Sequence, residues 1–439
     1  MHANPDKKKL TINIVTLGCS KNVVDSEVLL KQLGSNNIHV VHNEASFASK
    51  TVIINTCGFI SDAKQESVDT ILRFIRAKEQ GDIHHVYVMG CLSERYKPDL
   101  EKEIPNVDKY FGVNDLKQII EHLGLNFSRN LVGERTLTTP SHYAYLKISE
   151  GCDRSCAFCA IPIIRGRHLS KPMESIINEA VSLAEKGVKE LILIAQDLTW
   201  YGLDLYKQQA LPALLEKLSE VKGIEWIRLH YAYPAGFPKD LVRVMKERAN
   251  ICKYLDIPFQ HASDKVLKMM LRNHSQEQNY RLIESIRHEM PGITLRTTLM
   301  TGHPGEGARE FDELKRFVSE VRFDRLGIFT YSAEENTAAA INYNDRIPMK
   351  VKKARADELM LIQQGISKEL NNNKIGSLIK VLIDGREGEY YLGRSESDSP
   401  EVDHEILIAD TGQNLSTGKF YRVRITSAEE FDLYGEIVV

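Results

Sequence analysis

The stretch Gly151-Cys152-Asp153-Arg154-Ser155-Cys156-Ala157-Phe158-Cys159 carries three thiols in a C-x3-C-x2-C spacing. Residues three and four positions apart face the same way on a tight turn of backbone, so the three sulfurs can converge on one metal centre. Thiolate is a soft ligand that selects zinc, copper(I) or an iron–sulfur cluster. An iron–sulfur cube usually takes four thiolates, so a cube held by three leaves one iron open for a substrate or cosubstrate. The alternative interpretation is a structural zinc knuckle completed by His168.

The composition indicates a soluble globular protein. The chain has 439 residues, of which 42% are hydrophobic and 27% charged, which is enough for about three domains. Its first apolar run, residues 10–17, is short and interrupted by polar residues, so it suits a strand better than a signal peptide, and no run approaches a membrane span. Seven cysteines without a secretory leader predict metal or redox use in a reducing cytoplasm. We therefore expect a cytoplasmic protein without a membrane partner.

The N-terminal part alternates short apolar runs with helical patterns. Strand-like runs are expected at residues 12–17, 52–55, 86–89 and, more weakly, 110–113, and helices at 23–33, 63–77 and 115–123. Such alternation predicts an open parallel sheet of the flavodoxin-like kind. We expect this domain to span residues 8–127.

Three further cysteines each follow one of these strand runs, namely Cys19, Cys57 and Cys91. Parallel strands would deliver all three thiols to the same edge of the sheet. Each cysteine alone is more often a buried structural residue, but three in the same topological position predict a second three-thiolate site. The glycines beside them, Gly18, Gly58 and Gly90, allow close backbone approach to a bulky cluster.

A second domain is expected after residues 128–141, which lack periodicity and resemble a linker. Strands are expected at residues 145–148, 191–195, 226–230, 254–257, 294–300 and 325–331, with helices at 173–186, 212–221, 239–247, 264–271, 276–289 and 310–321. About six β/α units predict a partial or full (β/α) barrel whose active site lies at the C-terminal ends of its strands. The C-x3-C-x2-C loop directly follows the first of these strands. This domain is expected to span residues 138–370.

The last segment, residues 374–439, predicts a small closed β-barrel of the OB type. A helix over 351–370 leads into it, and its five strands are expected at 377–384, 389–393, 405–409, 420–426 and 433–438. Residues 375–439 contain six Lys and Arg against thirteen Asp and Glu, a net formal charge of −7. Since this charge repels phosphate, it favours a basic protein partner over RNA.

These motifs together resemble a known family over nearly the whole chain. The C-x3-C-x2-C loop after a first barrel strand resembles the radical S-adenosylmethionine (SAM) enzymes, and the segments 17–27, 55–59 and 90–91 resemble the methylthiotransferases among them. The segments 193–202, 256–264 and 329–337 resemble the RimO type, which modifies a ribosomal protein. The related MiaB type modifies a tRNA adenosine and differs at these places. One departure is His303, where a bulky aromatic residue is expected.

The resemblance implies two 4Fe–4S clusters and SAM as cofactors. Cys152, Cys156 and Cys159 would hold the cluster whose open iron binds SAM, and Cys19, Cys57 and Cys91 would hold a second cluster that presents the sulfur to be transferred. One SAM methylates that sulfur, and another yields a 5′-deoxyadenosyl radical. The implied substrate is the β-carbon of an aspartate in small-subunit ribosomal protein 12, with a flavodoxin or ferredoxin as electron donor and a TRAM domain as the terminal barrel. The alternative is methylthiolation of a tRNA adenosine.

Five residues are candidates for the SAM pocket. Phe158 can line the adenine or simply pack. Gln196 and Asp197 lie at the C-terminal end of a barrel strand, where polar side chains can hold the amine or ribose of SAM, and Gln260 and Tyr331 have similar places. Because an unactivated C–H bond has no useful acidity, no general base is expected and no catalytic residue beyond the clusters is assigned.

Three other side chains are expected to be structural. Lone histidines beside strands, such as His230 and His261, are more often hydrogen-bonded structure than ligands. Cys252 has no partner motif and is expected to be a core thiol.

Overall fold

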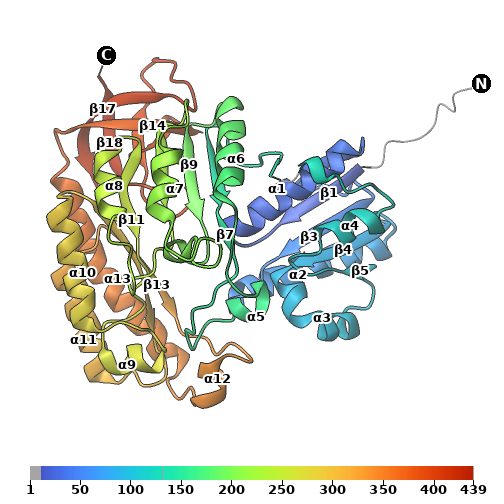
Figure 1. Ribbon diagram of the computed structural model, residues 1–439, viewed down its shortest axis with the longest axis horizontal. Helices are drawn as coiled ribbons and strands as arrows, with labels where there is room; N and C mark the ends of the chain where they lie inside the picture. Colours follow the sequence, from blue (N-terminus) through green and yellow to red (C-terminus); the bar gives the residue numbers. More distant parts are fainter. Residues whose placement is uncertain (1–10, 132, 439) are drawn as a thin grey trace, which may run out of the picture. The chain divides into compact units, whose positions relative to one another are not determined.

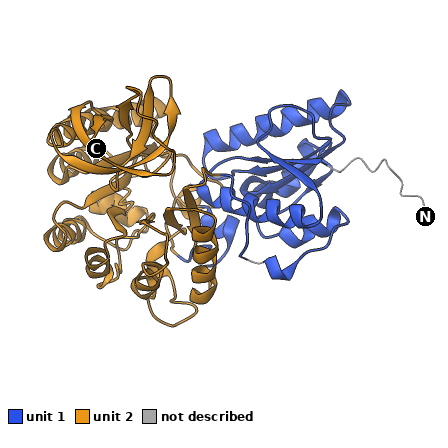
Figure 2. Ribbon diagram, turned by 90° about the horizontal axis from the view of Figure 1, so that it is seen from above, with its two compact units in different colours: residues 1–138, 150–153, 160–167 blue, residues 139–149, 154–159, 168–439 orange. Residues whose placement is uncertain are grey.

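The computed structural model describes residues 11–131 and 133–438, so the expected start of the first domain at residue 8 lies outside the described residues. The chain forms two compact units (Figure 2). Unit 1 comprises the chain up to residue 138 together with residues 150–153 and 160–167. Unit 2 comprises residues 139–149, 154–159 and everything from residue 168 onward.

Unit 1 is built on a five-stranded parallel sheet with the strand order β2-β1-β3-β4-β5 (Figure 1). This is the flavodoxin-like order, and it confirms the predicted fold class. The strands are β1 (Thr11–Thr16), β2 (His39–His42), β3 (Thr51–Thr56), β4 (His85–Gly90) and β5 (Lys109–Tyr110). The helices are α1 (Ser20–Ser35), α2 (Ser61–Glu79), α3 (Cys91–Glu103), α4 (Leu116–His122), the short 3-10 helix η1 (Arg129–Leu131) and α5 (Ile161–Arg165).

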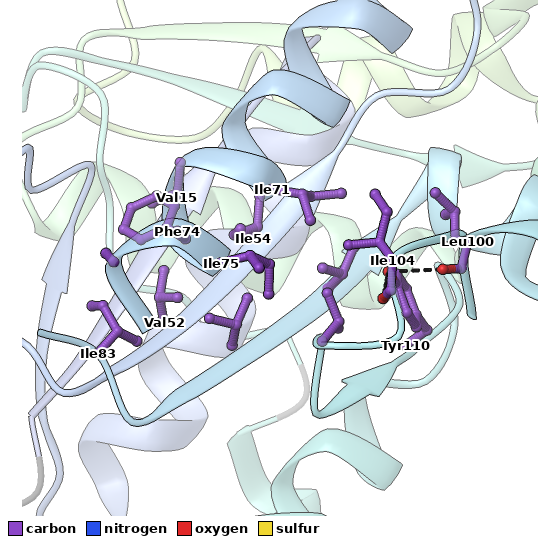
Figure 3. Packing of buried hydrophobic residues seen from close by; sticks show 14 of the residues in the cluster. Val15, Val52, Ile54, Ile71, Phe74, Ile75, Ile83, Leu100, Ile104 and Tyr110 are labelled. Atoms are coloured by element: carbon purple, nitrogen blue, oxygen red, sulfur yellow. Dashed lines mark hydrogen bonds between the residues drawn. The ribbon is translucent and has the colours of Figure 1, made fainter. Parts of the chain in front are cut away.

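The sheet of unit 1 is covered on both faces. Along β3, Val52 and Ile54 belong to one apolar cluster and Ile53 to another, because successive strand residues point to opposite faces. Figure 3 shows the first cluster, in which Phe74 packs with these valine and isoleucine side chains. A strand buried on both sides reads as a continuous apolar run, which is why the sequence pattern locates it well.

Besides the short helices η1 and α5, the strand β2 and the helix α3 of unit 1 were not expected from the sequence. The strand β2 is short, and none of its four residues is buried, so it lacks an apolar run. The helix α3 begins at Cys91 and contains Pro98 with a kink at Tyr96, and this irregularity hides its periodicity. The weak strand expected over 110–113 is reduced to Lys109–Tyr110.

The segment 128–141 has little regular structure, as expected of a linker, but part of it is fastened to α1. The Arg135 guanidinium donates to Glu27 Oε2 at 2.7 Å, and both side chains are buried. Glu27 Oε1 accepts hydrogen bonds from the Thr138 backbone N–H and hydroxyl. Arg135 and Thr138 therefore fasten the end of this segment that lies in unit 1 to α1.

Unit 2 contains six parallel strands in the order β13-β12-β11-β10-β9-β6, which form an open sheet. The predicted barrel is thus partial. Its strands are β6 (Tyr143–Lys147), β9 (Glu190–Ile194), β10 (Trp226–Leu229), β11 (Ile251–Asp256), β12 (Thr294–Thr301) and β13 (Arg325–Thr330). The remaining elements are β7 (Ser149–Glu150), β8 (Leu169–Ser170), α6 (Met173–Glu185), η2 (Leu198–Trp200), α7 (Leu211–Leu218), α8 (Leu241–Glu247), α9 (Asp264–Met269), α10 (Gln276–Glu289), α11 (Ala308–Val321), α12 (Ala338–Asn342) and α13 (Met349–Asn372).

The C-terminal strands close into a five-stranded barrel in the order β14-β15-β16-β18-β17, as predicted. They are β14 (Leu378–Glu387), β15 (Tyr390–Arg394), β16 (Ile406–Ala409), β17 (Phe420–Ala428) and β18 (Leu433–Ile437). Closure leaves no unpaired sheet edge. An interior of aliphatic residues, including Val381, Ile408 and Val423, fills the barrel.

The loop between β15 and β16, residues 395–403, packs against the six-stranded sheet. Asp398 accepts a hydrogen bond from Arg325 on β13, and Asp403 from Arg296 on β12 and from Tyr254 on β11. The loop makes further hydrogen bonds to the sheet. Glu401 accepts from the hydroxyls of Tyr143 and Tyr145 on β6. The Ser399 hydroxyl contacts His230, and the backbone carbonyl of Glu396 accepts from Arg228 on β10. The C-terminal barrel and the sheet therefore share a buried polar interface within unit 2.

The charges at this interface are paired. Burial would raise the pKa of Asp398, but the charges of Arg325 and Lys374 outweigh it and hold that pKa well below its ordinary value. Since Asp398 and Asp403 face arginines of the sheet, part of the −7 charge of the C-terminal segment is neutralised internally. Within the part of the chain that the structure describes, no helix is long and apolar enough to cross a membrane.

Replacing Asp398 by Ala is expected to destabilise unit 2 by about 3–5 kcal/mol, because it leaves the buried Arg325 without its counter-charge. Both tryptophans, Trp200 and Trp226, lie in unit 2, so urea unfolding followed by tryptophan fluorescence reports on this unit. Glu430→Ala is the control: its pair with Lys368 is exposed, so removing it should leave the unfolding midpoint nearly unchanged. Equal midpoints for the two variants would contradict the structural role of the loop.

Candidate functional site

Cys19, Cys57 and Cys91 follow three neighbouring strands of unit 1. β1 ends at Thr16, β3 at Thr56 and β4 at Gly90, and these strands are adjacent in the sheet. Parallel strands end at the same edge, so the loops that carry the three cysteines meet there. Cys19 is exposed, Cys57 is half-buried and Cys91 is buried.

Two glycines let these loops come into contact. Gly18 has φ +88°, and a Cβ added there would lie 2.6 Å from Cys57 Cβ and 3.0 Å from Cys57 Sγ. A Cβ added at Gly58 would lie 2.7 Å from the carbonyl oxygen of Cys91. Any side chain at these two positions would force the loops apart. The Cys19 loop is therefore packed against Cys57, and the Cys57 loop against Cys91.

The Asn22 side chain, fully buried on α1, fastens the three loops together. Its Nδ2 donates to the carbonyl of Leu17 at 2.8 Å and to the carbonyl of Thr56 at 3.0 Å, on the loops that lead to Cys19 and Cys57. Its Oδ1 lies 3.7 Å from Cys91 Sγ. One amide thus contacts all three loops of the site.

The three thiols influence one another electrostatically. Burial raises the pKa of Cys57, and raises that of Cys91 to about 12, and in both cases a neighbouring thiol of the set adds to the rise. The raised pKa values of Cys57 and Cys91 favour the protonated thiols, so metal binding at these two cysteines would release protons. Among the described residues, no group of three His, Cys, Asp or Glu side chains could hold a single metal ion. Three thiols on separate loops suit a cluster of several irons better than one ion.

The C-x3-C-x2-C loop is fixed at both ends. In unit 1, Cys152 N donates to the Gly166 carbonyl at 3.1 Å, and Gly151, at φ +70°, has no room for a Cβ beside the Arg167 carbonyl. In unit 2, Ala157 N donates to the Met270 carbonyl at 2.8 Å. These contacts hold the loop without using any of its three thiols.

Side chains around the second half of the loop form a buried apolar cluster in unit 2. Phe158 lies in a buried cluster with Tyr331, and Cys156 and Cys159 pack at its edge. The other buried members are Ala157, Val266, Met270 and Ala339. The backbone hydrogen bond from Ala339 N to the Ala157 carbonyl, at 2.7 Å, anchors α12 to the loop.

Two arginines that the sequence did not single out lie beside Cys156. Arg272 Nη1 donates to Cys156 Sγ at 3.6 Å. The Tyr233 ring is contacted by both guanidiniums, with Arg272 at 4.2 Å and Arg154 at 3.9 Å from its centroid. Burial lowers the pKa of His274 to about 3, so this imidazole is neutral and accepts from Arg272 Nε. Arg154 is paired with Asp197 at 2.8 Å, so Arg272 is the cation whose hydrogen bond reaches the Cys156 sulfur.

The predicted SAM-pocket residues lie in unit 2, at the C-terminal ends of their strands. Both carboxylate oxygens of Asp197 are already engaged, one by Thr199 and the other by Arg154 at 2.8 Å. Gln260 has φ +71° and forms a bridge with Leu299, so its backbone is fixed. The hydroxyl of Tyr331 is buried and has no hydrogen-bond partner among the described residues. The roles of these residues, and of the half-buried Gln196, remain predictions.

His303 occupies the place where an aromatic residue was expected, and it packs like one. Its ring makes edge contacts with Tyr331 at 4.9 Å and with Phe158 at 6.4 Å between centroids. Burial lowers the pKa of His303 to about 4, so the ring is neutral near pH 7 and can fill an apolar pocket.

The remaining candidates are structural. His168 Nε2 lies 3.1 Å from the Ser170 hydroxyl, and His230 contacts Ser399 at 2.8 Å. His261 Nε2 lies 3.1 Å from Glu306. Cys252 is buried, and burial raises its pKa to about 12, as expected of a core thiol.

Three family models match successive parts of the chain. Residues 11–112 match the uncharacterized protein family UPF0004, residues 146–318 the radical SAM superfamily, and residues 375–438 the TRAM domain. Among similar curated proteins, the ribosomal protein uS12 methylthiotransferase RimO of Bacteroides fragilis is 58% identical over 98% of this chain and 100% of its own length. The RimO proteins of Bacteroides thetaiotaomicron and Cytophaga hutchinsonii are 58% and 56% identical over 98% of this chain and 99% and 98% of their own lengths.

The chain belongs to the RimO family of methylthiotransferases. This membership makes it a radical SAM enzyme and implies SAM and 4Fe–4S as its cofactors. It also favours an iron–sulfur cluster over the zinc knuckle at the C-x3-C-x2-C loop, since zinc has no part in that chemistry.

Solved structures support the fold of this RimO-family chain. The radical SAM methyltransferase TsrM from Kitasatospora setae, solved with tryptophan and a SAM analogue, aligns with a TM-score of 0.54 at 13% identity over 73% of each chain. The cobalamin-dependent radical SAM enzyme OxsB aligns with a TM-score of 0.53 at 14% identity, over 82% of this chain and 56% of that one. At these identities the likeness concerns the fold alone.

Gly18→Ala is expected to weaken iron binding at the Cys19, Cys57 and Cys91 site, because the new methyl group would push the Cys57 loop away. The loss should be about tenfold or more in affinity. Iron is best measured after anaerobic reconstitution in a background with Cys152, Cys156 and Cys159 changed to Ala, so that only this site remains. Gly34→Ala, in α1 with no atom within 4 Å of the added Cβ, is the matched control and should retain the iron. Full iron content in Gly18→Ala would refute the packing argument.

Proposed function

We propose that this protein attaches a methylthio group to the β-carbon of an aspartate in ribosomal protein uS12. The observation that carries the proposal is the 58% identity, over 98% of this chain and 99–100% of the relatives, to RimO proteins whose names state ribosomal protein uS12 as the substrate. The convergence of Cys19, Cys57 and Cys91 at one sheet edge supports it, since sulfur transfer requires a site beyond the one for SAM.

The two three-cysteine sets each hold one 4Fe–4S cluster in this proposal. When bound, the cluster at Cys152, Cys156 and Cys159 supplies the electron for reductive cleavage of SAM, and the other supplies the sulfur. The chain's own contribution is to fix the thiols: Asn22, Gly18 and Gly58 hold one set in place, and Arg272 donates to the sulfur of Cys156 in the other.

SAM would lie against the buried apolar cluster around Phe158. That cluster, completed by the neutral ring of His303, would exclude water from the reacting groups. The buried Tyr331 hydroxyl is available to the adenosine, and Gln196 and Gln260 offer amides at the strand ends. Since Thr199 and Arg154 occupy both carboxylate oxygens of Asp197, we assign Asp197 to positioning Arg154.

A small electron carrier such as flavodoxin or ferredoxin would reduce the clusters. Methylthiolation of a tRNA adenosine is not favoured, because these relatives at 56–58% identity are named for uS12.

The first test is intact-mass analysis of uS12 and of tRNA after incubation with reduced, cluster-reconstituted enzyme and SAM. We expect one methylthio increment on uS12 and none on tRNA. Fragmentation should then locate the increment on an aspartate, and enzyme without reductant is the control. An increment on tRNA alone, or an unchanged uS12 mass with both clusters present, would refute the proposal.

The second test separates the two cysteine sets. Cys57→Ala should leave SAM cleavage to 5′-deoxyadenosine measurable while abolishing methylthio insertion, because only the sulfur-presenting site is damaged. Cys156→Ala should abolish both activities. Cys252→Ala, which removes a core thiol outside both sets, should retain both. Equal loss of SAM cleavage in Cys57→Ala and Cys156→Ala would contradict the division of roles.

A further inference from the structure

We infer that Arg165 is a positioning residue of the Cys19, Cys57 and Cys91 site, where its charge stabilises the bound cluster and sets the cluster's reduction potential. This inference rests on the proposed function, because it assumes that these three cysteines hold a cluster. Arg165 ends the short helix α5, which follows the C-x3-C-x2-C loop in sequence. The segment that contains it, residues 160–167, nevertheless belongs to unit 1.

Packing brings this segment to the three-thiol site. Ala160 and Ile164 form a buried apolar cluster with Cys91, and Phe59 and Val113 pack against it. Phe59 lies two residues after Cys57, so the helix is in contact with two of the three cysteine loops. This apolar contact fixes α5 at the site and accounts for the burial of a charged residue at its end.

The Arg165 guanidinium is buried and fully engaged. Its side chain is only 2% exposed, and Nη2 donates to Asn22 Oδ1 at 2.7 Å and to Asp25 Oδ2 at 3.1 Å. Nη1 donates to Glu150 Oε1 at 2.9 Å. Its closest contact is thus with the amide that fastens the three cysteine loops together.

The arginine also acts on the thiols through its charge. Burial raises the pKa values of Cys57 and Cys91 and is the larger effect in both. The positive charge of Arg165 opposes the rise at each of these thiols. Three thiolates carry a negative charge that a buried site must compensate. Arg165 is suited to this, because a guanidinium keeps its charge when buried and presents several donors in a fixed plane.

The two carboxylates limit this effect. Asp25 and Glu150 hold the guanidinium in place and offset part of its charge, so the net field at the thiols is a balance between one cation and two anions. Reduction adds negative charge to a cluster, so a weaker cation makes reduction harder and a weaker anion makes it easier. Changes at Arg165 and Asp25 should therefore shift the potential in opposite directions.

The experiment uses the full chain with Cys152, Cys156 and Cys159 changed to Ala, reconstituted anaerobically with iron and sulfide. The readouts are iron and sulfide per chain, resistance of the iron to a chelator, and the midpoint potential from a redox titration followed by electron paramagnetic resonance. None of these depends on turnover.

Arg165→Gln is expected to lower the midpoint potential and to weaken iron retention by about 10–100-fold. Arg165→Lys should restore part of both, because it keeps the charge but loses the planar set of donors. Asp25→Asn should raise the potential while leaving iron bound. A purely structural role would lower the iron content of these variants without shifting their midpoint potentials in opposite directions. The potentials of Asp25→Asn and Arg165→Lys therefore decide between the two roles, even if Arg165→Gln fails to hold iron.

Arg167→Gln is the matched control, since it removes an arginine of the same segment whose side chain is 92% exposed. It should leave the potential and the iron content unchanged. Identical potentials in all variants would overturn the role of Arg165 and leave the proposed function intact. Absence of iron from the cysteine background itself would instead overturn the second cluster, and with it this inference.

Discussion

The geometry of the three-thiol site depends on how the ends of parallel strands satisfy their buried carbonyl groups. Where β1 and β3 end, the ladder no longer supplies donors, and a buried carbonyl without a partner is costly. Asn22 supplies both donors from one amide, to Leu17 and Thr56, and Asn55 in turn donates to the Asn22 carbonyl at 3.0 Å. These hydrogen bonds involve the side chains of Asn22 and Asn55 and no thiol. The backbone that carries the cysteines is therefore held by groups other than the cluster ligands, which lowers the entropy cost of ordering it.

In unit 2, buried polar groups of the six-stranded sheet are paired by charged side chains. The strands carry Arg228, Arg296 and Arg325 at positions where an aliphatic residue would be ordinary, and the acidic loop 395–403 from the C-terminal barrel supplies the partners. A buried arginine without such partners would be strongly destabilising. The terminal barrel is consequently a structural part of this unit as well as a separate small fold.

The elements that could be predicted from the sequence are those marked by neighbouring residues, such as an apolar run or the spacing of cysteines. Strands such as β3 and β9 are continuous apolar runs, and the six candidate cluster cysteines follow strands, so their positions could be deduced from spacing and topology. Side chains that act across long separations could not be found this way: Arg165 lies 143 residues from Asn22, and Arg272 lies 116 from Cys156. The charge count of the C-terminal segment was misleading in part for the same reason, because a count cannot distinguish Asp398, which is paired inside the unit, from an acid on the surface.

The two three-cysteine sets differ in how their neighbouring cation is balanced. Arg165 contacts two carboxylates, Asp25 and Glu150, so its field at Cys91 is reduced. Among the described residues, the hydrogen-bond partners of Arg272 are the neutral His274, the Pro258 carbonyl and Cys156 itself, so its charge acts on the thiol undiminished by an acid. A cation that is not offset favours both the thiolate and an added electron. Two sites with the same number of cysteines are thus given different electrostatic environments by arginines outside either cysteine motif.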